Sequence, residues 1–464
     1  MRAPYFERPK AMNAIRVHAR RSGGRLWVGA LLALAVLPAG CSKDRLLGVN
    51  DPNVLLPSQV TSKDGLPADF AGALSDFQLS YSGSGGGPLT EGMINISGLF
   101  SDEFSISETF PDRIDIDRHT INPSSAPQLT LNFRALQRAR VSTERAAADY
   151  EQFDANNPLH AQALALAGYT YIMFGENFCS GVPFSQLDPN GIDLHFGDPQ
   201  TTTQIYDRAI ADFTEAQGVS GATATEKNLA ALGQARALLG EGKFAEAAAA
   251  AATVPTSFVY KIHHSSTTNR ENNGVWSFGR SIGRWTIGDR EGVNGLPFRS
   301  AADVRTPFAQ DSSGGVGVKG FDHTTPLYYS MKYATRDSSA VLAWGGEARL
   351  IEAEAALNAG DAATWLGKLN DLRATVGLAP LTDPGTVSGR IALHFLERAM
   401  WLQLTAHRLG DMRRQVKYFG MPVTSVYETG PHPKGGIWGT QVVLPIPFDE
   451  VNNPQFKQCL DTGV

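Results

Sequence analysis

The chain has 464 residues, with 41 Lys and Arg against 46 Asp and Glu. Residues 1–40 carry seven of the basic residues and one acidic residue, so the remainder has a formal net charge of about −11. This balance argues against nucleic acids and anionic membrane surfaces as main partners, because both require clustered positive charge. Hydrophobic residues make up 42% of the chain, which is enough to fill a substantial core.

The N-terminal segment has the features of a secretion signal. Basic residues, Arg20 and Arg21 among them, precede an apolar run of 12 residues at positions 26–37. Such a run suits the core of a signal peptide and is too short to span a bilayer. Small residues and then Cys41 follow, in an order that resembles the lipobox of bacterial lipoproteins. We therefore predict that residues 1–40 are a signal peptide and that Cys41 is the first mature residue and the lipid anchor.

The lipobox resemblance implies a cysteine that carries a diacylglycerol and an N-acyl chain. Two or more acyl chains anchor stably, because each buried methylene contributes about 0.8 kcal/mol. An ordinary signal peptide with an incidental cysteine is the alternative, and the true start is open because Met12 also begins a well-formed signal. Residues 41–57 are polar and read as a tether, which at about 3.3 Å per residue can hold the domain off the bilayer. No later apolar stretch is long enough for a transmembrane helix.

Helical periodicity dominates the remainder. Apolar residues recur at helical spacing in the segments 58–81, 129–150, 159–174, 231–254, 347–376 and 389–417. Leu164, Ala167, Gly168 and Tyr171 follow the order typical of the first helix of a tetratricopeptide repeat, where small residues let the partner helix approach. Segments 231–254 and 347–376 predict further helical hairpins, and 389–417 predicts one long helix. Such hairpins must stack to bury their apolar stripes, so the predicted fold class is mainly α.

The segment 255–342 differs from the helical segments in composition and periodicity. Gly, Ser, Thr, Asn and Arg dominate, helical periodicity is lost, and aromatic residues occur singly. Loop regions of this length are usually functional or disordered, and disordered segments are poor in aromatics. We therefore expect an ordered, irregular loop face inserted into the helical scaffold.

Five stretches together resemble motifs of the SusD/RagB family of surface lipoproteins. Residues 175–184 (GENFCSGVPF) resemble the family's YGGVPL stretch, and 348–355 (ARLIEAEA) followed by 369–373 (LNDLR) resemble its LYLIRAEA and LNAIR helices. Residues 397–414 resemble its ER…EGHRW.DL.R segment, with departures at 401–405, and 444–454 (LPIPFDEVNNP) resemble its LPIP..EI..NP ending. All five occur in the family's order behind the lipobox.

The resemblance implies a SusD-like helical domain over residues 58–464, with tetratricopeptide-like hairpins and the loop-rich insertion at about 255–342. Family members bind nutrients, mostly glycans, and sit over TonB-dependent outer-membrane barrels. We therefore expect a surface-exposed outer-membrane lipoprotein that delivers an oligosaccharide to a SusC-like transporter, with neither catalysis nor a cofactor. A surface glycoside hydrolase on a helical scaffold and a periplasmic repeat scaffold protein are the alternatives.

Aromatic and guanidinium side chains of the loops are the candidate ligand contacts. A flat ring can stack on the apolar face of a sugar, while amides and guanidinium groups hydrogen-bond its hydroxyls. The predicted contacts are Phe104, Trp276, Arg280, Arg284, Trp285, Tyr328 and Tyr329. The alternative is that these rings pin the loops to the helical core.

The richest charge cluster lies near the C-terminus and comprises Glu397, Arg398, His407, Arg408, Asp411 and Arg414. His407 and Asp411 are four residues apart and so share a helix face. Acid–base catalysis by this pair is possible, but we favour a structural network of ion pairs and hydrogen bonds that fixes the last helix.

Three further patterns were weighed. The pair His263–His264 lacks a third ligand at useful spacing, and Asp112, Asp115 and Asp117 lack the glycine and glutamate of a calcium loop, so no metal site is predicted. Cys179 and Cys459 are able to pair in an oxidising compartment, but two isolated cysteines favour buried thiols.

Overall fold

The computed structural model describes residues 62–85, 91–188, 193–313, 316–456 and 458–464. The predicted signal peptide, Cys41 and the tether therefore lie outside the described residues. Among the helices that are described, none combines the length and apolar character needed to cross a membrane.

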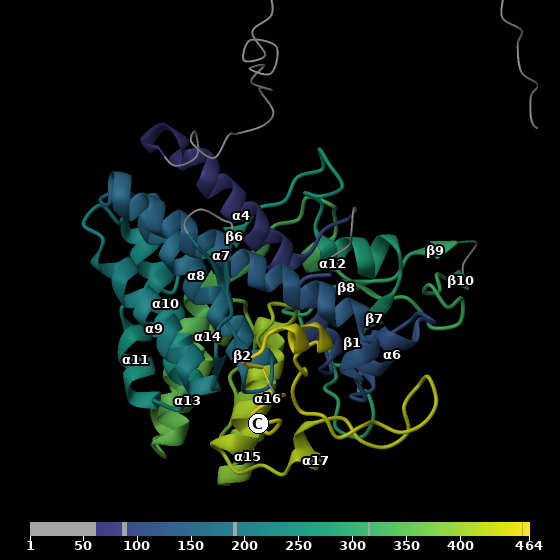
Figure 1. The fold of residues 1–464 in the computed structure, drawn as a ribbon. Coiled ribbons are helices and arrows are strands. Elements are labelled where there is room, and N and C mark those ends of the chain that lie inside the picture. The colour runs from purple at the N-terminus through teal and green to yellow at the C-terminus, as the bar shows by residue number, and fades with distance from the viewer. Residues whose placement is uncertain (1–61, 86–90, 189–192, 314–315, 457) are drawn as a thin grey trace, which may run out of the picture. The chain divides into compact units, whose positions relative to one another are not determined.

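Helical hairpins form the scaffold, as the periodicity predicted. The long helices of its first part are α4 (Leu66–Ser82), α7 (Pro127–Asp154), α8 (Pro158–Asn177), α9 (Thr202–Gly218), α10 (Ala224–Gly240) and α11 (Phe244–Ala252). Those of its second part are α13 (Gly345–Asn358), α14 (Ala362–Ala374), α15 (Val387–Leu402) and α16 (Arg408–Lys417). Neighbours along the chain pack on each other, and α11 packs on α13, so the two parts form one stack (Figure 1).

Small residues on α8 and α10 let the hairpins approach closely. The Phe213 ring of α9 lies against both Gly168 and Gly233, and a Cβ at these positions would lie 2.7 Å and 2.2 Å from the ring. The helices also begin at side-chain caps: Thr201 and Gln204 form a capping box at α9, and Thr223 and Glu226 form one at α10. Residues 202–218, which the periodicity analysis did not assign, therefore complete the first tetratricopeptide-like hairpin with α8.

The segment expected to be one helix over 389–417 is two helices. Helix α15 ends at Leu402 and α16 begins at Arg408, and in the connection both Leu404 and Ala406 have positive φ angles, 56° and 58°. The Glu103 carboxylate accepts the Leu404 backbone N–H at 2.8 Å, and the Tyr333 hydroxyl donates to the Leu404 carbonyl at 2.8 Å. These tertiary contacts hold a left-handed backbone that side-chain periodicity does not reveal.

Short antiparallel strand pairs carry the loop face. Strand β1 (Phe104–Ile106) pairs with β7 (Trp285–Ile287), and β6 (Val259–Ile262) pairs with β12 (Ala340–Trp344). The other pairs are β8 (Phe308–Ala309) with β11 (Tyr329–Ser330), β9 (Ser312–Ser313) with β10 (Val316–Gly317), β2 (Val182–Pro183) with β5 (Pro199–Gln200), and β3 (Gln186–Leu187) with β4 (Leu194–His195).

Short helical turns complete the described elements. The α-helical ones are α5 (Met93–Leu99), α6 (Pro111–Asp117), α12 (Gly274–Trp276) and α17 (Val423–Val426). The others are η1 (Lys63–Gly65), η2 (Pro123–Ser125), η3 (Ser277–Ser281, a π-turn), η4 (Met331–Tyr333) and η5 (Phe448–Asn452). The fold is therefore mainly α with an irregular loop face, as predicted.

Cys179 and Cys459 form a disulfide, so the expectation of buried thiols is wrong. The C-terminal segment returns along the residues that follow α8: the Ser180 N–H donates to the Asp461 carbonyl at 3.0 Å, and the Leu460 N–H donates to the Ser180 carbonyl at 2.8 Å. This chain return places the two cysteines, which are 280 positions apart in sequence, side by side. Spacing in the sequence carries no signal for such a contact.

Candidate functional site

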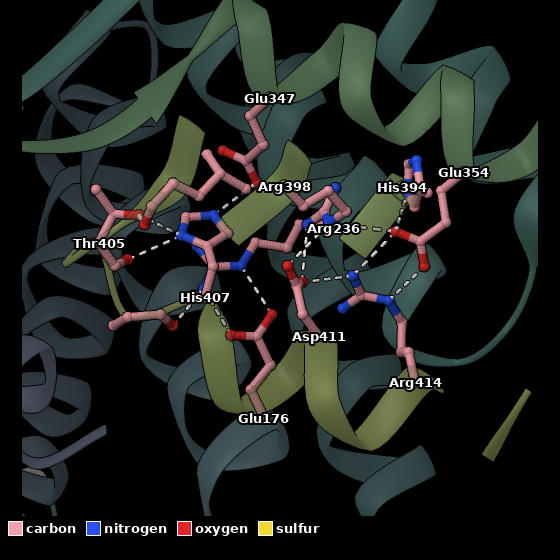
Figure 2. Close-up of polar contacts among 12 residues, drawn as sticks. Glu176, Arg236, Glu347, Glu354, His394, Arg398, Thr405, His407, Asp411 and Arg414 are labelled. Carbon is pink, nitrogen blue, oxygen red and sulfur yellow. Dashed lines mark hydrogen bonds and ion pairs between the residues drawn. The ribbon is translucent and has the colours of Figure 1, made fainter. Parts of the chain in front are cut away.

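Four residues of the C-terminal charge cluster lie in a buried network, shown in Figure 2: Arg398, His407, Asp411 and Arg414. Arg398 of α15 donates from Nε and Nη2 to the two carboxylate oxygens of Asp411 on α16, at 3.0 and 2.9 Å. Arg414 of α16 donates to both oxygens of Glu354 on α13, at 2.8 and 3.1 Å, and to Asp411 at 2.6 Å. His394 lies 3.4 Å from Glu354.

The network works by charge pairing inside the core. Burial raises the pKa of Glu354, but the facing guanidinium groups of Arg414 and Arg398 outweigh burial and hold that pKa below its usual value. The pKa of Asp411 is lowered against burial by the same two arginines. Each carboxylate is therefore ionised and fully engaged, and the network ties α13, α15 and α16 together, as the structural interpretation predicted.

Other motif residues extend the same pattern to neighbouring elements. Arg236 of α10 donates to both oxygens of Glu176 on α8, at 2.8 and 2.6 Å (Figure 2). Arg408 likewise donates to both oxygens of Asp102, at 2.6 and 3.0 Å. Paired charges thus link the helical hairpins to the segment that precedes β1.

Two of the seven predicted ligand contacts lie in the core. Trp285 has no exposed surface and stacks on Phe278, with ring centroids 5.1 Å apart and an interplanar angle of 16°. Phe104 is 2% exposed and packs on Trp285 at 6.0 Å. This is the arrangement expected if these rings hold the loops on the core.

Tyr328 and Tyr329 lie side by side on the strand pair β8–β11 and the loop before it. The Arg299 guanidinium lies 4.1 Å from the centre of the half-buried Tyr328 ring, and Arg280 lies 4.4 Å from that of Tyr329. The Tyr329 ring is buried, and its hydroxyl donates to Asp311 at 2.7 Å. Burial and this carboxylate raise the pKa of Tyr329. Tyr329 therefore contacts both Arg280 and Asp311.

An open cavity of about 550 Å³ contains Trp276 and Arg280, two of the predicted contacts. Trp276 is half-buried at the end of α12, and the exposed Arg336 guanidinium lies 5.4 Å from its ring centre. Arg280 is held by the Ala334 carbonyl at 2.8 Å and by Asp311 at 3.5 Å. The other lining residues are Ser266, Ser281, Thr335 and Asp337. We call this the Trp276 cavity.

The Trp276 cavity combines an aromatic ring with polar groups of both charges. Guanidinium groups donate hydrogen bonds, carboxylates accept them, and hydroxyl-rich ligands present both functions. Indole faces stack on apolar ligand faces. The hydrogen bond from the Thr335 side chain lowers the pKa of the exposed Asp337 carboxyl, so it accepts hydrogen bonds at neutral pH. The cavity is therefore suited to a neutral polyol with one apolar face.

Arg284 lies in a separate patch with two exposed rings that sequence reasoning did not select. Its guanidinium lies 5.4 Å from the Phe110 ring centre and 5.0 Å from that of Phe321, and the two rings are 6.0 Å apart. Phe110 and Phe321 are 45% and 39% exposed. Arg284 also forms an ion pair with the buried Glu108. Isolated phenylalanines in polar loops were the available signal, but the pairing depends on the fold.

The residues of the two candidate metal-binding patterns contact other protein side chains. His264 hydrogen-bonds the Ser82 hydroxyl at 2.7 Å and Gln78 at 2.9 Å. Asp115 pairs with Arg118 at 2.6 Å, and Asp117 lies 2.9 Å from His432. Across the residues described by the structure, no group of three His, Cys, Asp or Glu side chains is arranged to hold a metal ion.

Comparisons with known proteins agree with this architecture. No family model and no curated relative matches the chain. A SusD superfamily protein from Parabacteroides distasonis matches with a TM-score of 0.65 at 16% identity, over 85% of this chain and 98% of the other. Surface glycan-binding protein A from Bacteroides uniformis matches at 0.63 and 14% identity, over 86% and 99%. A laminarin binding SusD-like protein matches at 0.56 and 16% identity, over 86% and 99%.

The architecture defines a class of proteins in which stacked helical hairpins carry an irregular loop face. Within that class, this chain has the SusD-like fold, over most of its length. The fold that the sequence resemblance implied is thereby confirmed.

Proposed function

We propose that this protein is a SusD-like outer-membrane lipoprotein that captures an oligosaccharide in the Trp276 cavity and delivers it to a TonB-dependent, SusC-like barrel. The observation that carries the proposal is the half-buried Trp276 ring in an open cavity lined by Arg280, Arg336 and Asp337. A glycan-binding role for two proteins of the same fold supports the ligand class.

Capture requires positioning and no covalent step. The indole of Trp276 stacks on the apolar face of one sugar ring. The Arg280 and Arg336 guanidinium groups donate to hydroxyl oxygens, while the Asp337 carboxylate accepts from hydroxyl groups. The cavity is open, so the other sugar residues of the oligosaccharide extend beyond it. Binding is reversible. Ordered helical hairpins beneath supply a frame that keeps these groups in place.

The anchor and the partner follow from the same proposal. Cys41 carries the lipid, residues 41–57 form the tether, and residues 58–464 form the capture domain above the outer membrane. The SusC-like barrel takes up the released oligosaccharide. Co-purification of the intact lipoprotein with a large outer-membrane barrel is the expected result, and isolation without any barrel in mild detergent contradicts delivery.

A panel of soluble oligosaccharides tests capture against the rival functions. We expect the protein to be retained saturably on a glycan-containing gel. We also expect it to release no new reducing ends from the oligosaccharides. Release of shorter sugars points instead to a glycoside hydrolase. Protease treatment of whole cells separates surface exposure, which predicts degradation, from a periplasmic scaffold, which predicts survival.

A further inference from the structure

A second cavity, of about 420 Å³, opens between the strand pair β6–β12 and the C-terminal end of α15. Its aromatic wall is formed by Trp344 of β12 and Trp401 of α15, whose ring centroids are 5.3 Å apart. It shares no lining residue with the Trp276 cavity. We call it the Trp344 cavity.

The mouth of the Trp344 cavity is apolar and open to solvent. Val259, Val304 and Val376 line it and are 43%, 63% and 43% exposed. Three exposed valines beside two half-buried tryptophans form a contiguous apolar surface, and such surfaces mark binding sites more often than chance exposure does. A flat apolar group that enters the cavity would remove part of this surface from water.

Two lysines that line this cavity, Lys261 and Lys332, form no ion pair within the described residues. Arg305 is neutralised by Asp303 at 2.7 Å and by Glu397 at 2.5 Å. His407 and Glu347 pair with each other at 2.9 Å. Lys261, on the same wall, is exposed and therefore hydrated.

Lys332, the other unpaired lysine, is half-buried. Its Nζ donates to the Gln403 carbonyl at 3.0 Å, and no carboxylate forms an ion pair with it in the described part of the chain. Glu103 is the acid with the largest electrostatic effect on Lys332, and burial raises the pKa of Glu103 to about 8. Burial lowers the pKa of Lys332 to about 8, against the charge of Glu103, which raises it. An ammonium group has three donors, and one carbonyl satisfies only one of them.

Trp401 adds an unused donor on the same wall. Its Nε1–H is buried and has no hydrogen-bond partner among the described residues. Neighbouring protein atoms cover this donor, so a ligand in the cavity does not reach it directly. The cavity thus offers an apolar wall and mouth and a cation.

From this combination we infer that the Trp344 cavity binds a small aryl carboxylate, with its ring against Trp344 and the valines and its carboxylate toward Lys332. The volume suits this class, because ligand pockets run from about 300 to 1,000 Å³. A sugar would leave the apolar mouth uncompensated, so the site differs in chemistry from the Trp276 cavity.

Calorimetric titration with indole-3-acetate and its neutral counterpart indole-3-acetamide tests the inference. We expect the acid to bind at least about tenfold more tightly than the amide, because one good charge-assisted contact is worth that factor. Lys332→Met should abolish the difference, and Trp344→Ala should weaken both ligands. Equal binding of acid and amide by the native protein, or no binding at millimolar concentration, overturns the inference.

A matched pair of variants at exposed Val304 separates an effect on binding from a defect in folding. Val304 is exposed at the mouth, so Val304→Asp should repel the acid while Val304→Asn leaves its affinity within about twofold. Trp276→Ala should leave both affinities unchanged, and Val304→Asp should retain oligosaccharides normally. Failure of the glycan proposal and failure of this one are therefore distinguishable. If Val304→Asp binds the acid as well as Val304→Asn does, the site is not at this cavity.

Discussion

Arg398 on α15 and Asp411 on α16 form a two-point ion pair across a sharp break in the chain, with both donor–acceptor distances at or below 3.0 Å. Both side chains are at most 2% exposed. The pair fixes the angle between the two helices that replace the expected long helix, and it connects through Arg414 to Glu354 on α13 (Figure 2).

Arg398→Met should destabilise the fold strongly, because it leaves Asp411 buried with one guanidinium fewer. Removal of one member of a buried pair lowers the free energy of unfolding by about 3–5 kcal/mol. Urea unfolding followed by circular dichroism measures the change. Arg390→Met removes the partly exposed pair between Arg390, which is on the same helix as Arg398, and Asp383 in the preceding loop, and it should shift the midpoint little. Equal shifts for the two variants would contradict a supporting role for the buried pair.

The disulfide between Cys179 and Cys459 should contribute substantially to stability. It closes a loop of 280 positions, and by chain entropy such a loop stabilises the folded state by about 5 kcal/mol. The double variant Cys179→Ser/Cys459→Ser should unfold at a lower urea concentration than the oxidised protein. Dithiothreitol should lower the midpoint of the native protein to that of the variant and leave the variant unchanged. A native midpoint that does not respond to the reductant is the opposing result.

His119 should make the protein less stable in acid. Its ring stacks on Phe100 at 4.4 Å and meets Trp438 edge-on at 5.3 Å, and burial lowers its pKa to about 3. The pKa in the unfolded chain is about 6.5, so between pH 6.5 and 3 the unfolded state binds more protons than the folded state. Stability contributed by the neutral ring is therefore present above pH 6.5 and is lost as the pH falls through this window.

From pH 7.5 to 5 this single group should remove about 2 kcal/mol of unfolding free energy. His119→Asn suits the positive φ of 60° at this position and carries no titrating ring. The variant should start less stable at pH 7.5 yet lose about 2 kcal/mol less than the native protein on acidification. Urea titrations at both pH values give the comparison. Parallel losses would show that the ring does not titrate with this shift.

The proposed lipid anchor at Cys41 has a direct chemical test. Cells fed radiolabelled palmitate should label the native protein, and Cys41→Ser should remove the label because no other residue of the predicted signal can form the thioether. The double variant Cys179→Ser/Cys459→Ser serves as the control and should keep the label, since those cysteines form the disulfide. Label retained after Cys41→Ser argues for attachment elsewhere.

Local patterns in the sequence were sufficient to predict most helices of the scaffold. Gly168 predicted close helix packing, and Phe213 of α9 indeed lies against it. The ion-pair motif around Arg398 was assigned a structural role, and its contacts are buried and mutual. In both cases the local pattern along one helix marks the residue, although its partner lies on another helix.

The features that sequence reasoning missed depend on contacts between distant segments. The break at Leu404 is held by Glu103 and Tyr333, and the disulfide depends on the return of the C-terminal segment. Trp285 and Trp276 lie in the same loop region. The path of the backbone places Trp285 on Phe278 and Trp276 in an open cavity. Composition predicts that a loop holds rings; it does not predict which ring faces solvent.

The most direct test of the account is the affinity of Trp276→Ala for the oligosaccharide that the native protein retains best, measured by isothermal titration. Loss of a stacked ring is worth about 0.5–1.5 kcal/mol beyond its buried area, so the account predicts affinity at least about tenfold weaker, with no products formed. Phe196→Ala, which removes an exposed ring that does not line the Trp276 cavity, should bind as the native protein does. Native affinity in Trp276→Ala would contradict capture at this cavity.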